Sequence, residues 1–424
     1  MRTTKNVFIC MFFLILIQFA ALLAQDLMPA KPEDVGLSSD RLQRLSAVIQ
    51  GYVDQQRLPG AVVLVARHDK VAYFRPFGYQ DMGLAVPMQE GTIFRIASQS
   101  KAITSVGVMI LQEQGRLLIN DPVGKYLPEF AKTQVATADG KGGYSIVDAK
   151  RPITVRDLLT HTAGISYGNG PAKEMWQKAG IQGWYFADRD EPIGDTISRL
   201  ASLPFDAQPG EQWIYGYSTD ILGALIEKVS GQTLAEFLDD QIFQPLGMID
   251  THFYLPAEKK DRLAVVYSIA DDGSLVRAPE PGDGIGQGAY VQGPRKSTSG
   301  GAGLLSTARD YARFLQMLLN GGELDGNRLL SRKSVELMTA NHISDIEYRD
   351  GRGFGLGLEI VLDVGEKGQP GSKGEYGWGG AYHSIYWVDP LEDLLVVYFT
   401  QVIPATGLDD HDKLHALVHQ AIID

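Results

Sequence analysis

The chain has 424 residues, of which 44% are hydrophobic and 21% are charged, which is the composition of a globular protein with a sizeable core. Its formal net charge is −12, so we expect no nucleic-acid partner, because phosphate backbones repel an acidic surface. The single cysteine, Cys10, excludes a disulfide framework and a thiolate metal site.

Residues 1–24 predict a secretory signal peptide. Arg2 and Lys5 precede an uncharged apolar run that ends at the small residue Ala24. This pattern is typical of a cleaved signal, and we expect cleavage after Ala24. An uncleaved anchor is the alternative, since the run is almost long enough to span a bilayer. We therefore expect a periplasmic or secreted protein that has no cysteine and no membrane contact after cleavage.

The first elements of the mature chain are a helix and a hairpin. Apolar residues recur at three- and four-residue steps over residues 39–56, and Ser38 or Ser39 can cap the start of this helix. Two apolar runs, residues 61–66 and 71–74, then flank a short polar turn, which indicates a β-hairpin.

The later elements place more strands near the C-terminus. A strongly apolar helix is expected over residues 102–111, and roughly 98–290 has mostly helical patterns broken by glycine-rich loops, including a helix over 212–229. A second hairpin over 384–400 and a helix over 409–422 close the chain. We predict one α/β domain of the α+β type over residues 25–424. Its antiparallel sheet comes from both chain ends and is flanked by helices, beside a mostly helical subregion.

Ser98 and Lys101 form the strongest local chemical signal. They belong to the only Ser-x-x-Lys in the chain, and residues three apart share one face of a helix. A serine hydroxyl needs a neighbouring base or buried amine to become a nucleophile, and a partly desolvated lysine favours the neutral amine. The motif is short, and its alternative interpretation is an exposed helix start with Ser98 as the N-cap.

An ordered series of segments resembles the class C β-lactamase and penicillin-binding-protein superfamily, and is most similar to its family VIII carboxylesterases. The similarity extends over nearly all of residues 27–403. Its blocks are TIFRIASQSKAIT (92–104), DPVGKYLP (121–128), ITVRDLLTHTAGI (153–165), PG…WIY (209–215), SGGAGLLSTARD (299–310) and WGG (378–380). This resemblance implies a β-lactamase/transpeptidase-like fold and a serine hydrolase without a cofactor or metal.

The resemblance also implies roles for individual residues. Ser98 would be the acylated nucleophile, with Lys101 and Tyr215 as its proton-transfer partners. Which of Lys101 and Tyr215 is the general base stays open. The backbone N–H groups of Ser98 and Ala381 would form the oxyanion hole. Trp378, Gly379 and Gly380 would line the substrate pocket.

Two residues depart from the family's pattern. Tyr217 stands where many relatives have asparagine, and Trp378 stands where β-lactamases have lysine. A tryptophan cannot offer a cation to a substrate carboxylate, so β-lactam hydrolysis is doubtful and an apolar acyl or alcohol group fits better. We count Tyr217 among the substrate-binding candidates.

One further motif and two histidines are weaker candidates for functional residues. Residues 164–168 match Gly-x-Ser-x-Gly, but a loop rather than a strand precedes them, so we interpret the match as chance while keeping Tyr167 as a substrate contact. His161 is a candidate orienter or base, but we expect it to be a buried, hydrogen-bonded structural histidine. His383 follows the expected pocket strand and could face the cleft.

His411, His415 and His419 are spaced by four, and the first two mimic His-Glu-x-x-His. Asp412 replaces the glutamate of that motif, and a terminal helix is a poor place for an enclosed site. We therefore expect a solvated helix face and no metal.

The sequence thus predicts a hydrolase that forms an acyl-enzyme on Ser98 and acts on a small-molecule ester or amide, most plausibly esters with small or medium acyl groups. Alternatives are a β-lactamase, a D-alanyl-D-alanine carboxypeptidase or a D-amino peptidase. A non-catalytic binding protein of the same fold is a further alternative. The oligomeric state is not predicted.

Overall fold

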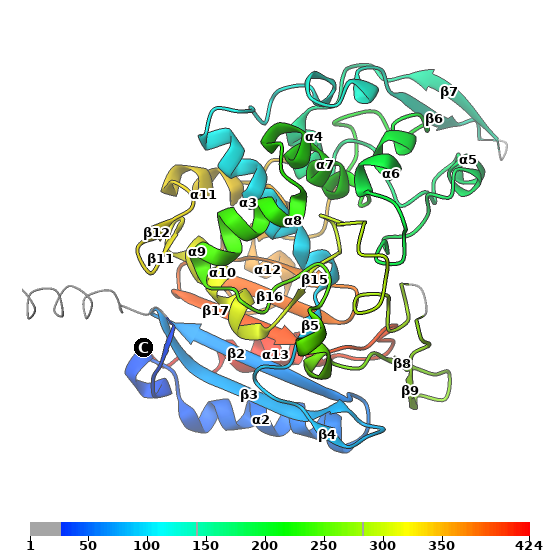
Figure 1. Ribbon diagram of the computed structural model, residues 1–424. Coiled ribbons are helices and arrows are strands. Elements are labelled where there is room, and N and C mark those ends of the chain that lie inside the picture. Colours follow the sequence, from blue (N-terminus) through cyan, green and yellow to red (C-terminus); the bar gives the residue numbers. More distant parts are fainter. Residues whose placement is uncertain (1–26, 141–142, 282–283) are drawn as a thin grey trace, which may run out of the picture.

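The computed structural model describes residues 27–140, 143–281 and 284–424, so the expected signal peptide lies outside the described residues (Figure 1). Within the described ranges, none of the helices combines the length and the apolar character needed to cross a membrane.

A nine-stranded sheet contains strands from both ends of the chain, as predicted (Figure 1). Its order is β1 (Met28–Pro29), β3 (Lys70–Asp81), β2 (Gly60–Arg67), β17 (Leu394–Phe399), β16 (Ser384–Asp389), β15 (Tyr376–Gly380), β14 (Glu359–Val361) and β13 (Arg352–Phe354), with β4 (Val86–Pro87) beside β3. The N-terminal and C-terminal strands meet at β2 and β17, which pair antiparallel with Val65 opposite Val396. Only the edge pair β1 and β3 is parallel among these pairings, so the predicted antiparallel sheet is confirmed in its main part.

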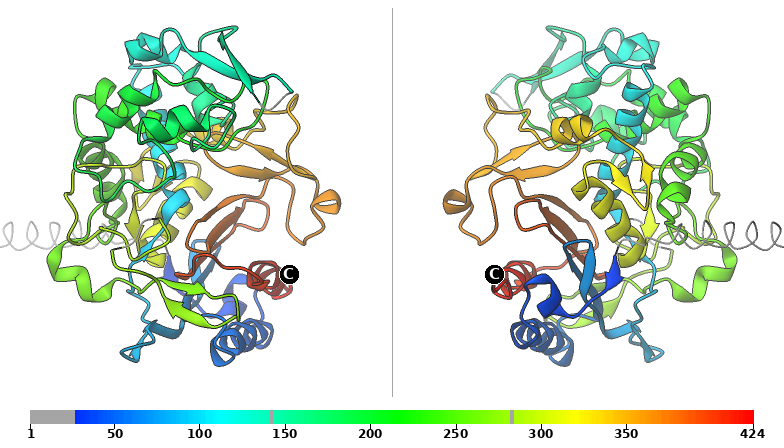
Figure 2. Two further views of the ribbon diagram at one scale, coloured as in Figure 1. Left: turned by 90° about the vertical axis from the view of Figure 1, so that its right-hand side faces the viewer. Right: turned by 90° about the vertical axis from the view of Figure 1, so that its left-hand side faces the viewer.

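Both faces of the sheet centre are buried, and the two faces pack against different helices. Every residue of β2 is buried, as expected for a strand covered on both sides. Val63 and Val65 pack with α2 (Ser39–Asp54) and α13 (Asp410–His419), whereas Val62 and Leu64 face the larger core that contains α3 and α10. Figure 2 shows α2 and α13 together on one side of the sheet and the helical region on the other.

The helical region is the part in which the sequence prediction needs correction. Two hairpins lie inside it, because short β-branched runs there pair locally: β6 (Gln134–Ala138) with β7 (Tyr144–Asp148), and β8 (Tyr267–Ile269) with β9 (Leu275–Arg277). The helix predicted from residue 212 begins only at Ser218. The α-helices from here to the sheet's outer strands are α3 (Ser100–Glu113), α4 (Val155–Leu159), α5 (Lys173–Lys178), α6 (Ile193–Leu200), α7 (Ser218–Ser230), α8 (Leu234–Leu238), α9 (Gln244–Leu246), α10 (Ala308–Leu319), α11 (Arg332–Met338) and α12 (Val364–Lys367). Two small pairs, β5 (Phe94–Arg95) with β10 (Leu305–Ser306) and β11 (Glu323–Leu324) with β12 (Asn327–Arg328), complete the strands.

A capping box fixes the start of α4, the helix that leads into the loop beginning at His161. The Thr154 side chain accepts the Asp157 N–H, and the Asp157 carboxylate accepts the Thr154 N–H. Arg151 donates two further bonds to that carboxylate, at 2.6 and 2.9 Å. Burial alone would raise the pKa of Asp157, but these hydrogen bonds outweigh burial and hold the pKa below its ordinary value.

Replacing Asp157 by asparagine should therefore lower the free energy of unfolding at neutral pH by about 1–3 kcal/mol. Because the folded-state pKa is depressed, the contribution is complete above the unfolded-state pKa and is lost as the pH falls through the folded-state pKa. Urea unfolding at pH 7 and at progressively lower pH should show the two proteins converging. Asp345→Asn, at an exposed position, is the matched control; an equal loss there would contradict the role of Asp157.

Candidate active site

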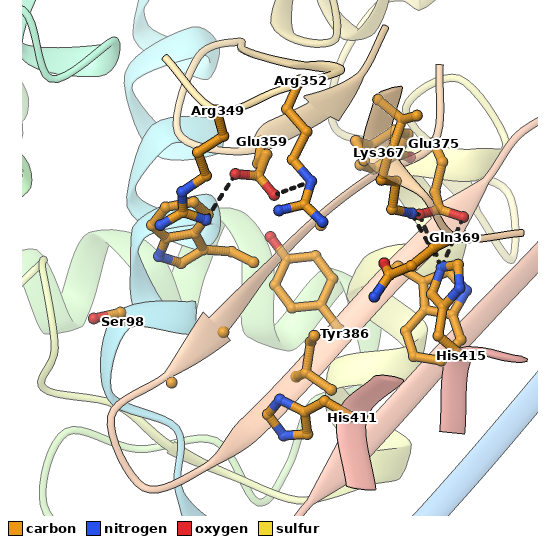
Figure 3. A pocket seen from close by; sticks show the side chains of 18 of the residues that line it. Ser98, Arg349, Arg352, Glu359, Lys367, Gln369, Glu375, Tyr386, His411 and His415 are labelled. Atoms are coloured by element: carbon orange, nitrogen blue, oxygen red, sulfur yellow. Dashed lines mark hydrogen bonds and ion pairs between the residues drawn. The ribbon is translucent and has the colours of Figure 1, made fainter. Parts of the chain in front are cut away.

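Ser98 lies on a tight turn between a buried strand and a buried helix. The 3-10 turn Ala97–Gln99 connects β5 to α3, and Ala97 adopts a positive φ of 42°, which is unusual for a residue with a side chain. This turn places Ser98 at one end of a cavity of about 550 Å³ that runs along β15 (Figure 3). The hydroxyl is thus presented to a space that a small ligand could enter.

Lys101 is 1% exposed and lies directly beside Ser98. Its Nζ is 3.4 Å from Ser98 Oγ, 3.2 Å from Tyr167 Oη and 2.8 Å from the carbonyl oxygen of Gly301. Within the described ranges no carboxylate forms an ion pair with Lys101. A buried amine held by three oxygens, one of them the serine hydroxyl, is suited to exchange a proton with that hydroxyl.

Asp220, on α7, supports the contacts of Lys101. We did not identify this residue from the sequence. Its fully buried carboxylate accepts the Ser299 hydroxyl at 2.5 Å and the Gly301 N–H at 3.1 Å. These bonds fix the turn whose Gly301 carbonyl oxygen binds Lys101. Burial raises the pKa of Asp220 despite the opposing effect of the nearby Lys101 charge. The only signal in the sequence was an acidic residue in the first turn of an otherwise apolar helix.

Tyr215 contacts Lys101 through its ring rather than through its hydroxyl. Lys101 Nζ lies 4.5 Å from the Tyr215 ring centroid, within cation–π range. The Tyr215 oxygen accepts the indole N–H of Trp378 at 3.0 Å. Tyr167 packs edge-on against the Tyr215 ring, and burial raises the pKa of Tyr167 well above its usual range, so Tyr167 stays a neutral phenol.

Strand β15 forms the wall of the cavity beside Ser98. Trp378, Gly379, Gly380 and the following Ala381 all line the cavity, as expected from the sequence. Gly380 lies so close to the turn that a Cβ there would be 2.6 Å from the Ile96 carbonyl oxygen. A glycine is therefore needed to let β15 approach the nucleophile turn.

Two of the predicted substrate contacts are corrected by the structure. Tyr217 is fully buried and donates its hydroxyl to the Gly183 carbonyl oxygen at 2.6 Å, because its ring stacks on Trp176 in the core. The His383 ring turns to α13, where Nε2 lies 2.7 Å from an Asp410 carboxylate oxygen. Neither side chain lines the cavity. Tyr167, in contrast, reaches the lysine itself.

His161 is buried as expected but lacks the expected hydrogen bond. Neither ring nitrogen has a partner among the described residues, and the ring packs against Tyr215, Trp213 and Phe354. Burial, and secondarily the Lys101 charge, lower the pKa of His161 well below its usual range. The imidazole is therefore a neutral part of the aromatic packing behind Tyr215.

The structure agrees with the prediction for the Gly-x-Ser-x-Gly match but not with the prediction for the histidines of α13. Ser166 of the Gly-x-Ser-x-Gly match lies in a loop and accepts the Gly168 N–H, so the match forms no nucleophile elbow. The expectation of a solvated histidine face on α13 is wrong. His415 and His419 are only 8% and 6% exposed in their side chains, because this face of α13 packs against the sheet.

The sequence matches the Beta-lactamase family over residues 45–420. The chain belongs to this family. It is 35% identical to Protein Rv1367c of Mycobacterium tuberculosis over 384 residues (86% of this chain, 90% of that protein). It is 33% identical to Esterase EstB of Burkholderia gladioli over 377 residues (84% and 89%). The solved structure of EstCE1, described as a hydrolase with promiscuous acyltransferase activity, superposes with a TM-score of 0.76 at 28% identity (89% and 98%).

These findings confirm the predicted family resemblance, the β-lactamase/transpeptidase-like fold and the expectation of an enzyme of the serine-hydrolase class.

Proposed function

We propose that the protein is a carboxylesterase that forms an acyl-enzyme on Ser98 and prefers esters with small or medium acyl groups. The observation that carries the proposal is the 3.4 Å approach of the buried Lys101 amine to Ser98 Oγ at the end of an open cavity. Membership of the Beta-lactamase family and the similarity to Esterase EstB support it.

The contacts of Lys101 account for the proton in the first step. In the uncharged form that this step requires, the Lys101 amine has two N–H donors and one lone pair. The donors suit the Gly301 carbonyl and Tyr167, and the lone pair can then accept the Ser98 proton as Oγ attacks the ester carbonyl. The proton passes to the departing alcohol oxygen, with Tyr215 as the second member of the relay. Water then attacks the acyl-enzyme, and the same groups take a proton from this water and pass it to the departing Ser98 oxygen, which releases the carboxylic acid.

The negative charge that develops on the carbonyl oxygen needs N–H donors. We assign this role to the backbone N–H groups of Ser98 and Ala381, two residues that both line the cavity. Their elements are held at close approach by Gly380. Donors fixed before the reaction stabilise such a charge without reorganisation.

The cavity wall favours an ester over a β-lactam. Beside Ser98 it presents the aromatic side chains of Tyr167, Trp184, Tyr215 and Trp378. Trp378 stands where the family's β-lactamases have a lysine, and its indole N–H is already bonded to Tyr215. An apolar acyl or alcohol group can bury surface against these rings. The two arginines that also line the cavity, Arg349 and Arg352, are already paired with Glu359.

Intact-mass measurement after brief exposure to p-nitrophenyl butyrate, and separately to benzylpenicillin, tests the proposal. We expect an acyl adduct or burst with the ester, its loss in Ser98→Ala, and no turnover of the penicillin. Ser166→Ala is the matched control and should keep the reaction. Rapid penicillin hydrolysis would instead indicate a β-lactamase. No Ser98-dependent reaction with either compound would overturn both functions and favour a narrow peptidase or a binding protein.

A further inference from the structure

Four side chains of metal-ligand type converge between α13 and the sheet, at the end of the cavity remote from Ser98. His415 and His419 come from α13, Glu375 precedes β15, and Asp389 ends β16. Their side chains are 8% exposed or less. Figure 3 shows Glu375, His415 and the neighbouring Lys367 grouped at this end, with Ser98 at the other.

Three pairs of these side chains hold their ligand atoms at separations close to those of a coordination shell. His415 Nε2 lies 3.1 and 3.2 Å from the two Glu375 oxygens. His419 Nε2 lies 3.6 Å from Glu375 Oε2 and 3.7 Å from Asp389 Oδ2. Bonds of about 2.0–2.1 Å to a tetrahedral ion put neighbouring ligand atoms about 3.3–3.4 Å apart. The observed separations bracket that value.

Two of these ligand atoms lie within ion-pair distance of each other but make no hydrogen bond of normal length within the described residues. His419 Nε2 and Asp389 Oδ2 have no hydrogen-bond partner within the described residues. His419 Nδ1 donates its proton to the His415 carbonyl oxygen at 2.9 Å, so Nε2 is the ring nitrogen that faces the two carboxylates. A lone pair and two carboxylate oxygens repel one another unless a cation or a proton lies between them.

We propose that Glu375, His415 and His419, with Asp389 as the fourth ligand, bind a divalent transition-metal ion such as Zn²⁺. Two imidazoles and two carboxylates without a thiolate suit this ion. Glu375 and His415 line the cavity, which supplies an entry path. The ion would link α13 to β15 and β16, and its role is structural because Ser98 lies at the opposite end.

Lys367 competes with this ion. Its Nζ lies 2.6 Å from Glu375 Oε1 and 3.3 Å from His415 Nε2, so the ammonium partly neutralises the cluster in the metal-free protein. Within the described residues this ammonium pairs with Glu375 and not with Asp389. Lys367 also lines the cavity, into which its side chain would turn when the ion enters. Removing this amine should therefore strengthen metal binding, whereas a simple ion-pair network would only be weakened.

Equilibrium dialysis of the chelator-treated, full-length protein against Zn²⁺, with the bound metal counted by mass spectrometry, tests the proposal. We expect one Zn²⁺ per chain, a loss of affinity of at least about 100-fold in His419→Ala and Glu375→Gln, and a gain of about 10-fold in Lys367→Met. His411→Ala, on the same helix but outside the four ligands, should bind as the wild type does. Ser98→Ala should also bind normally, which separates this test from the esterase proposal.

Spectroscopy of Co²⁺ bound to the wild-type protein provides a second test, which does not depend on the folding of any variant. Co²⁺ in a tetrahedral site of nitrogen and oxygen ligands gives an intense visible absorption, and one equivalent should saturate it and raise the thermal midpoint. Absence of one-to-one binding of either ion to the wild type and to Lys367→Met would overturn the proposal. Binding that is lost in His411→Ala but kept in His419→Ala would also overturn it.

Discussion

Replacing Lys101 by methionine is expected to reduce kcat for ester hydrolysis by about 10³- to 10⁴-fold and to change KM by less than about 10-fold. Methionine keeps the length and apolar stem of lysine but has no group that can take the Ser98 proton across the 3.4 Å contact. The amine acts as the serine proton moves, so its loss should be felt mainly in kcat. Steady-state kinetics with p-nitrophenyl butyrate provide the measurement.

The packing around Lys101 makes a folding control necessary. The side chain is buried, and its removal leaves the Gly301 carbonyl oxygen without a donor. Circular dichroism and the thermal midpoint should show that Lys101→Met still folds. Lys101→Arg keeps the positive charge but cannot accept a proton, so a similar loss of kcat is expected. Activity of either variant within about 10-fold of the wild type would refute Lys101 as the proton acceptor.

The sequence predicted the elements near the N-terminus well, because local residue patterns determine these elements. The residue spacing and Ser38 predicted α2, and Ser38 does accept the Arg41 N–H at its start. The turn between the apolar runs of β2 and β3 predicted their pairing. The hairpins at 134–148 and 267–277 were missed, because their strands are short and several of their residues are exposed, so no clear alternation marks them.

For the site, the three-residue spacing was enough to bring Ser98 and Lys101 together, since one turn of helical backbone fixes their relation. Side-chain direction in loops was not predictable. Tyr217, two residues after Tyr215, turns into the core, and His383 turns to α13. On α13 the apolar pattern of the sequence already indicated that His415 is buried. His415 lies beside Leu414 and three residues before Val418, both fully buried, so the apolar stripe of the helix already included it.

Tyr215→Phe is expected to lower kcat by about 10²- to 10³-fold with little effect on stability. Phenylalanine keeps the ring, and with it the cation–π contact to Lys101 at 4.5 Å, so the substitution removes only the oxygen that accepts the Trp378 N–H. The loss should therefore report the hydroxyl as a proton carrier and not as a packing group. Pre-steady-state kinetics should show the acylation burst slowed together with the steady-state rate.

Trp378→Phe is the companion variant, because it removes the donor to Tyr215 while keeping an aromatic wall. If the indole N–H merely orients the phenol, this variant should lose only about 10-fold in kcat. The double variant should then lose no more than Tyr215→Phe alone, since the indole would have no oxygen left to orient. If Tyr215→Phe keeps kcat within about 3-fold of the wild type, Tyr215 is not in the relay. Lys101, already in contact with Ser98 Oγ, would then carry the proton without it.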